Sequence, residues 1–224
     1  MIKTVFFDFD GTLADTARDL VGAANQQRIR AGLEPLPFES LRTFSSQGAP
    51  GLLKAALDLT PEDDAYASTR EQFLKDYYAR MTDETVLFDG IPELLNQLEQ
   101  LGFQWGIVTN KAENLSFPIF KYLKLHNRSI ANICGDTAAR PKPFPDPLFL
   151  AAEHAKVAPE ECIYVGDDER DIIAGKAAGM KTIAISYGYW PDITSIPNWQ
   201  ADAIADSPKT LFSAILNLSK EYIK

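Results

Sequence analysis

The 224-residue sequence contains few cysteines and few positive charges. Its two cysteines, Cys134 and Cys162, are too few for a disulfide framework, and a chain of this length can bury a core that needs none. A reducing cytoplasm is therefore the expected location. The formal net charge of -9 argues against broad electrostatic binding to nucleic acid or to an anionic membrane, because both need clustered Lys and Arg.

The sequence also lacks long apolar runs. Nowhere do about 18 consecutive apolar residues occur, so no membrane-spanning helix is predicted. The opening residues reach two aspartates by position 10, which excludes the apolar region of a signal peptide. We therefore expect a soluble protein. Its acidic net charge makes a small molecule the expected partner, and a monomer or a weak homodimer is the expected state.

Five short apolar runs, each followed by a turn signal and a helical pattern, predict the fold. The predicted strands are residues 4–7, 105–108, 130–134, 162–165 and 182–186. Helical length and composition occur at residues 91–101, 145–154 and 168–178. This repetition of strand and helix predicts an α/β fold with a doubly wound, Rossmann-like parallel sheet.

The interval between the first two predicted strands does not follow this alternation of strand and helix. Residues 15–85 carry helical patterns, so we predict an inserted α-helical domain on a core of residues 1–14 and 86–224. Thr60 and Pro61 predict the start of one of its helices, whose apolar face would include Tyr77. An insertion after the first strand lies beside the ligand crevice of an α/β sheet, so it is expected to cover the site.

Carboxylates follow two of the predicted strands. Asp8 and Asp10 end the first strand, and an acidic cluster at residues 167–171 follows the fourth. A strand-end aspartate is also a common helix cap or turn former, and for Asp8 alone that alternative is equally good. If the strand order is 3-2-1-4-5, however, Asp8 and Asp167 nearly meet at the point where such sheets bind ligands. Crowded carboxylates repel unless a hard cation holds them, which predicts Mg²⁺.

Two further segments offer groups for a phosphate. Thr109 and Asn110 end the second predicted strand, where a hydroxyl, an amide and free backbone N–H groups can hold phosphate oxygens. Prolines alternate around Lys142 in residues 140–147 and would hold this lysine in a fixed direction. The same segment also fits a proline-rich surface linker.

Taken together, these motifs resemble the haloacid dehalogenase superfamily. The four motifs of that family match, in order and across nearly the whole chain, Asp8-x-Asp10-Gly-Thr, Thr109, Lys142 and Gly166-Asp167-x-x-x-Asp171. The insertion resembles the helical C1 cap of the family. Residues 105–111 and Tyr187-Gly188-Tyr189 are similar to phosphoglycolate phosphatase-type enzymes, a group that includes the phosphatase of N-acetylmuramic acid 6-phosphate.

The resemblance implies a Mg²⁺-dependent phosphatase that acts on a small phosphorylated metabolite of the 2-phosphoglycolate or N-acetylmuramate 6-phosphate type. Asp8 would attack phosphorus, form an aspartyl phosphate and bind the metal. Asp10 would protonate the leaving alkoxide and later deprotonate water, while its backbone carbonyl meets the metal. Asp167 would be the remaining protein ligand of Mg²⁺.

The resemblance also implies how the phosphate is held. Thr109, the Asn110 amide and Lys142 would neutralise the charge of the phosphoryl oxygens. Asp171 would orient Lys142 or a metal-bound water, and Asp168 would cap the following helix.

Gln47 and Gly48 belong to a segment, residues 45–51, that resembles the substrate-specificity loop of the family. A plain turn between helices is the alternative for this segment. Two other classes of function stay open as well: a sugar phosphomutase built from the same motifs, and a phospho-accepting signalling module with a similar sheet and carboxylates.

Overall fold

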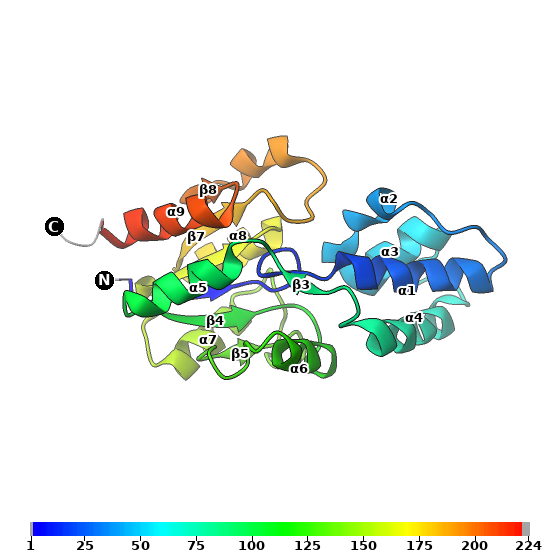
Figure 1. Ribbon diagram of the computed structural model, residues 1–224, viewed down its shortest axis with the longest axis horizontal. Helices are drawn as coiled ribbons and strands as arrows, with labels where there is room; N and C mark the ends of the chain where they lie inside the picture. The colour runs from blue at the N-terminus through cyan, green and yellow to red at the C-terminus, as the bar shows by residue number, and fades with distance from the viewer. Residues whose placement is uncertain (1, 221–224) are drawn as a thin grey trace.

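The structure, a computed structural model that describes residues 2–220, has a central sheet of six parallel strands (Figure 1). The strand order is β5-β4-β1-β6-β7-β8. The strands are β1 (Thr4–Phe7), β4 (Gln104–Val108), β5 (Asn132–Ile133), β6 (Cys162–Gly166), β7 (Lys181–Ile185) and β8 (Ala203–Ala205). The predicted order 3-2-1-4-5 is confirmed, with β5 shorter than expected and β8 as an additional edge strand that was not predicted.

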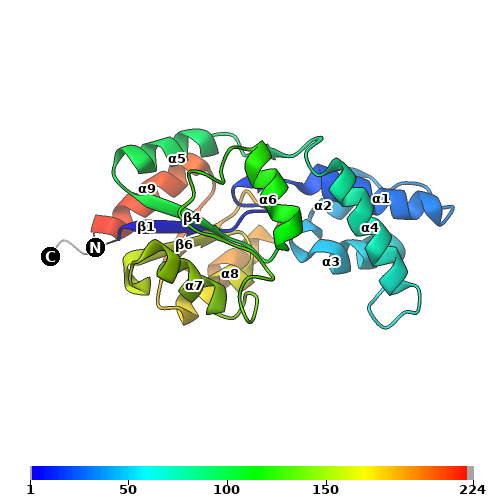
Figure 2. The ribbon, with the colours of Figure 1, turned by 90° about the horizontal axis from the view of Figure 1, so that it is seen from below.

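Helices cover both faces of the sheet, because successive side chains of β1 point to opposite sides. Val5 and Phe7 join one apolar cluster, whereas Phe6 belongs to another. Figure 2 shows helices on both sides of the strands. The first side has α5 (Ile91–Gln100) and α9 (Pro208–Lys220), extended by α6 (Glu113–Tyr122), and the second has α7 (Asp146–Ala155) and α8 (Glu169–Ala177).

Four further helices lie together beyond the carboxyl end of β1 (Figures 1 and 2). They are α1 (Ala17–Arg30), α2 (Phe38–Arg42), α3 (Gly48–Leu57) and α4 (Tyr66–Arg80). Their contacting faces bury apolar side chains that include Leu20, Leu52, Phe73 and Tyr77. The helices thus lie where the predicted insertion was expected, while the division into two domains at residues 15 and 85 stays a prediction.

The start of α4 corrects one expectation. Thr60 does not cap this helix, which begins at Tyr66. Instead, the backbone N–H and the hydroxyl of Thr60 donate hydrogen bonds to the Asp63 carboxylate at 2.7 and 3.0 Å. Because Asp63 folds back on Thr60, these residues form a turn of their own before the helix.

Two short links join the helices to the sheet. Their strands β2 (Ala14–Asp15) and β3 (Val86–Leu87) pair antiparallel, and sequence patterns cannot detect strands of two residues. Beside them the buried Asp19 carboxylate accepts hydrogen bonds from the backbone N–H groups of Glu84 and Thr85. The remaining regular elements are 3₁₀ turns at Ser45–Gln47, Pro159–Glu161 and Ile193–Trp199. Within residues 2–220, no helix has both the length and the apolar character needed to cross a bilayer.

Candidate active site

A cavity of about 880 Å³ lies between the carboxyl end of the sheet and helices α1, α3 and α4. Its lining includes eight of the nine predicted site residues: Asp8, Asp10, Thr109, Asn110, Lys142, Asp171, Gln47 and Gly48. The ninth, Asp167, lies against Asp8 and Asp171. The fold therefore brings together groups from three strand ends, from the loop of Lys142 and from the helices beyond the sheet.

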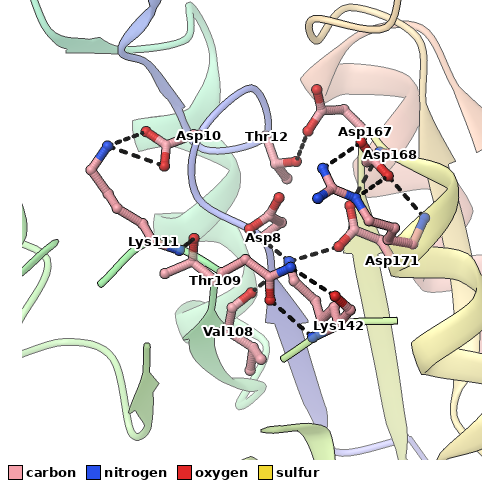
Figure 3. Close-up of polar contacts among 12 residues, drawn as sticks. Asp8, Asp10, Thr12, Val108, Thr109, Lys111, Lys142, Asp167, Asp168 and Asp171 are labelled. Atoms are coloured by element: carbon pink, nitrogen blue, oxygen red, sulfur yellow. Dashed lines mark hydrogen bonds and ion pairs between the residues drawn. The ribbon is translucent and has the colours of Figure 1, made fainter. Parts of the chain in front are cut away.

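Lys142 lies at the centre of this arrangement (Figure 3). Its Nζ is 2.9 Å from Asp8 Oδ1 and 2.7 Å from Asp171 Oδ1, and the side chain is 3% exposed. Burial alone would lower the pKa of Lys142, but the charges of Asp171 and Asp8 outweigh it and raise this pKa above the usual value. The site thus holds a permanent buried cation next to Asp8, and residues 140–147 are not a surface linker at this lysine.

The side chain of Asn110 holds the backbone of Lys142. Its Oδ1 accepts a hydrogen bond from the Lys142 N–H at 2.9 Å, and its Nδ2 donates to the Lys142 carbonyl at 2.9 Å. The carboxamide of Asn110 is therefore engaged in positioning the lysine loop. Within residues 2–220, the backbone N–H of Asn110 donates no hydrogen bond and is available for the predicted contact with a phosphate.

Three buried carboxylates crowd together beside Lys142. Asp8, Asp167 and Asp171 each offer an oxygen within 4.8 Å of the others. Burial, and then the charges of Asp8 and Asp171, raise the pKa of Asp167 well above its usual value. The Oδ1 of Asp8 is buried and, within residues 2–220, accepts no hydrogen bond of good geometry even though Lys142 is near.

This donor set fits Mg²⁺, which prefers a few carboxylate oxygens and keeps its other positions for water and phosphate. Asp8 and Asp167 are the residues that would hold it. The loop of Gly11 approaches Asp167 so closely that a Cβ at position 11 would lie 2.3 Å from Asp167 Oδ2, and Gly11 has φ +86°. Glycine is thus required here both for space and for backbone conformation.

Asp171 is already engaged by protein donors through both of its oxygens. Oδ1 accepts from Lys142 and, at 3.1 Å, from the hydroxyl of Tyr164, while Oδ2 accepts from the Asp168 N–H at 3.1 Å. Asp168 in turn is the N-cap of α8, as expected, and accepts from the Arg170 N–H at 2.9 Å. These contacts favour Asp171 as a residue that orients Lys142 over Asp171 as a metal ligand.

The carboxylate of Asp10 points away from the other aspartates (Figure 3). It accepts hydrogen bonds from the hydroxyl of Thr16 and, at 3.0 and 3.3 Å, from Lys111 Nζ. Lys111 also donates to the hydroxyl of Tyr77 in α4 at 2.7 Å. No local sequence signal indicates Lys111, because its contact is with a residue 34 positions away in the chain. The predicted approach of the Asp10 carbonyl to a metal stays a prediction.

The predicted specificity segment faces the same cavity. Gly48 has φ 61° and ψ -151°, a conformation that is essentially restricted to glycine, and the exposed Gln47 precedes it. The Ser46 carbonyl accepts a hydrogen bond from Arg170 Nη2 at 2.8 Å. The segment is therefore fixed to the sheet side of the site, a contact that sequence reasoning also missed.

Comparisons with known proteins agree with this geometry. Residues 5–185 match the family described as haloacid dehalogenase-like hydrolase. The chain is 37% identical to the N-acetylmuramic acid 6-phosphate phosphatase of Pseudomonas aeruginosa, over 96% of this chain and 95% of that protein. It is 40% identical to a phosphoglycolate phosphatase of Xanthomonas campestris pv. campestris, over 94% of this chain and 95% of that protein.

A solved structure shows the same fold. The putative phosphoglycolate phosphatase from Lactobacillus delbrueckii subsp. bulgaricus superposes with a TM-score of 0.84 at 24% identity, covering 95% of this chain and 98% of that one. The family match spans most of the chain, and both named relatives align along almost their entire length. The chain therefore belongs to the haloacid dehalogenase-like hydrolase family.

Proposed function

We propose that this protein is a Mg²⁺-dependent phosphatase that hydrolyses a small phosphomonoester through an aspartyl phosphate on Asp8. The observation that carries the proposal is the position of Asp8 between a buried cation and a second buried carboxylate, at the wall of one cavity. This arrangement supports a nucleophile that meets an anionic phosphoryl group without repelling it.

Lys142 and Thr109 would bind the phosphoryl oxygens. Lys142 has its ammonium within 2.9 Å of Asp8, so it reaches the same space that a phosphoryl group attacked by Asp8 must enter. Thr109 lines the cavity one residue after β4. A Mg²⁺ ion held by Asp8 and Asp167 would supply further positive charge to the phosphoryl oxygens.

Asp10 would transfer protons to the leaving group and from the attacking water. Its carboxylate lines the cavity two residues after Asp8 and is held by Thr16 and Lys111, so its direction is fixed before substrate arrives. As a general acid it would protonate the leaving alkoxide, and as a general base it would then take a proton from the water that cleaves the aspartyl phosphate.

The relatives and the cavity support a substrate with a carboxylate on its leaving group. The named relatives are phosphatases of N-acetylmuramic acid 6-phosphate and of phosphoglycolate, and the leaving groups of both esters carry a carboxylate. A cavity of about 880 Å³ is far larger than a phosphate group, so most of its wall is available for the leaving group.

The experiment that tests this function is phosphate release from a panel of phosphomonoesters in Mg²⁺ or EDTA, with the native protein and with Asp8→Asn. We expect metal-dependent release that falls by about 10⁴-fold or more in Asp8→Asn. Asp58→Asn is the matched control, because Asp58 is an exposed aspartate outside the site, and it should keep full activity.

Other outcomes would contradict the proposal. Stable phosphorylation without turnover would indicate a phospho-accepting module, and transfer to a second position of a sugar without free phosphate would indicate a phosphomutase. Release that is unchanged in Asp8→Asn would exclude Asp8 as the nucleophile.

A further inference from the structure

Helix α4 presents one face to the cavity. Arg70, Leu74 and Tyr77 occur at positions i, i+4 and i+7 of this helix and all line the cavity wall. Tyr77 is buried and contacts Lys111 next to Asp10, whereas Arg70 is exposed. This face therefore runs from the reaction centre to a part of the cavity that the proposed chemistry does not use.

The charges along the cavity single out Arg70. Five cationic side chains line the cavity, and four of them have a carboxylate partner: Lys75 with Glu71 at 2.6 Å, Lys111 with Asp10 at 3.0 Å, Lys142 with Asp8 at 2.9 Å and Arg170 with Asp168 at 2.8 Å. Within residues 2–220, Arg70 has no ion pair and no side-chain hydrogen bond. Its guanidinium is thus the cavity cation whose donors are available to a ligand.

The spacing along α4 indicates how far the backbone of Arg70 lies from the reaction centre. Seven residues separate Arg70 from Tyr77, which corresponds to about 10 Å along the helix axis. The carboxylate of 2-phosphoglycolate is only two carbons away from its ester oxygen. In a 6-phosphorylated sugar that bears an acidic ether on its ring, the carboxylate lies on the far side of the ring, at a separation comparable to this spacing.

We propose that Arg70 determines substrate specificity by binding a carboxylate on the leaving group, remote from the phosphate. This inference rests on the phosphatase function proposed above and names the substrate class: a phosphorylated sugar with a carboxylate on the opposite side of its ring. Arginine suits the task, because its planar fork of N–H donors pairs with a carboxylate through two parallel hydrogen bonds.

The test compares two esters that differ by the carboxylate, N-acetylmuramate 6-phosphate and N-acetylglucosamine 6-phosphate, with native protein, Arg70→Gln and Lys75→Gln. We expect Arg70→Gln to lower kcat/KM by about tenfold for the first ester, mainly through KM, and to leave the second unchanged. Lys75→Gln is the matched control, since Lys75 lines the same cavity but is neutralised by Glu71, and it should affect both esters equally.

p-Nitrophenyl phosphate separates this inference from the function on which it rests. If Arg70→Gln hydrolyses p-nitrophenyl phosphate like the native protein and also keeps the native preference between the two sugar esters, the role of Arg70 is excluded while the phosphatase stands. If the native protein releases no phosphate from any ester, the proposed function fails first. We expect 2-phosphoglycolate turnover to be less affected, because its carboxylate lies close to its phosphate. If Arg70→Gln lowers the turnover of this ester as much as that of N-acetylmuramate 6-phosphate, Arg70 does not select for a remote carboxylate.

Discussion

The two walls of the cavity contain ion pairs of nearly the same length in very different surroundings. On the sheet side, Lys142 lies 2.7 Å from Asp171, and both side chains are buried. On the helix side, Lys75 lies 2.6 Å from Glu71, and the two side chains are 64% and 69% exposed. Distance alone therefore says little about the energy of an ion pair, because water screens the exposed pair and not the buried one.

This difference matches what each wall is proposed to do. Groups that stabilise charge in a transition state work best when they are fixed in advance and shielded from water, as Lys142 is by Asn110 and Asp171. The helix wall has exposed side chains that can adapt to a leaving group.

Replacing one lysine of each wall by methionine should give the largest difference in the free energy of unfolding. Lys142→Met leaves Asp8 and Asp171 without their buried cation, and we expect a loss of about 3–5 kcal/mol in the free energy of unfolding. Lys75→Met should change it little, because its pair with Glu71 is exposed. Urea unfolding of both variants without Mg²⁺ measures the difference, and equal losses would show that burial does not distinguish the pairs.

The stabilisation of the protein by Mg²⁺ should depend on pH, because the carboxylates are crowded. The raised pKa of Asp167 in the folded protein means that the folded state retains a proton which the unfolded chain releases above about pH 4. The metal-free protein should therefore lose stability as pH rises, and Mg²⁺, which replaces the proton, should raise the melting temperature more at pH 8 than at pH 5.

The variant Asp167→Asn tests this assignment. It should abolish most of the Mg²⁺-induced rise in melting temperature and flatten the pH dependence of the metal-free protein. Asp146→Asn is the control, because Asp146 pairs with the exposed Arg140 away from the cluster. A full Mg²⁺ effect in Asp167→Asn would place the metal elsewhere.

The smallest effect is expected at the specificity segment. Gln47→Ala should change the order of preference among the phosphomonoesters by a few-fold while leaving the Mg²⁺ affinity unchanged, because Gln47 lines the cavity without belonging to the carboxylate cluster. Parallel kinetics and metal titrations measure both quantities. An unchanged order of preference would favour a plain turn between helices.

Sequence patterns were sufficient to locate five of the six strands of the sheet and the residues at the strand ends. Buried strands such as β1 and β6 are continuous apolar runs, and the carboxylates that follow them, Asp8 and Asp167, are local signals. Patterns failed where the signal is too short or depends on distant contacts. The two-residue strands β2 and β3 have no detectable period, and the turn at Thr60 depends on a side-chain contact that competes with helix capping.

Local sequence patterns were enough for the fold class and for the identities of the groups around Asp8, because apolar periodicity and turn chemistry act over a few residues. The strand order had to be assumed, and the contacts of those groups came from the tertiary structure. It assigned the side chain of Asn110 to the Lys142 backbone, joined Asp10 through Lys111 to Tyr77, and left Arg70 unpaired within residues 2–220 of the chain. Such contacts join residues that are far apart in the chain, and packing, which local propensity does not encode, selects them.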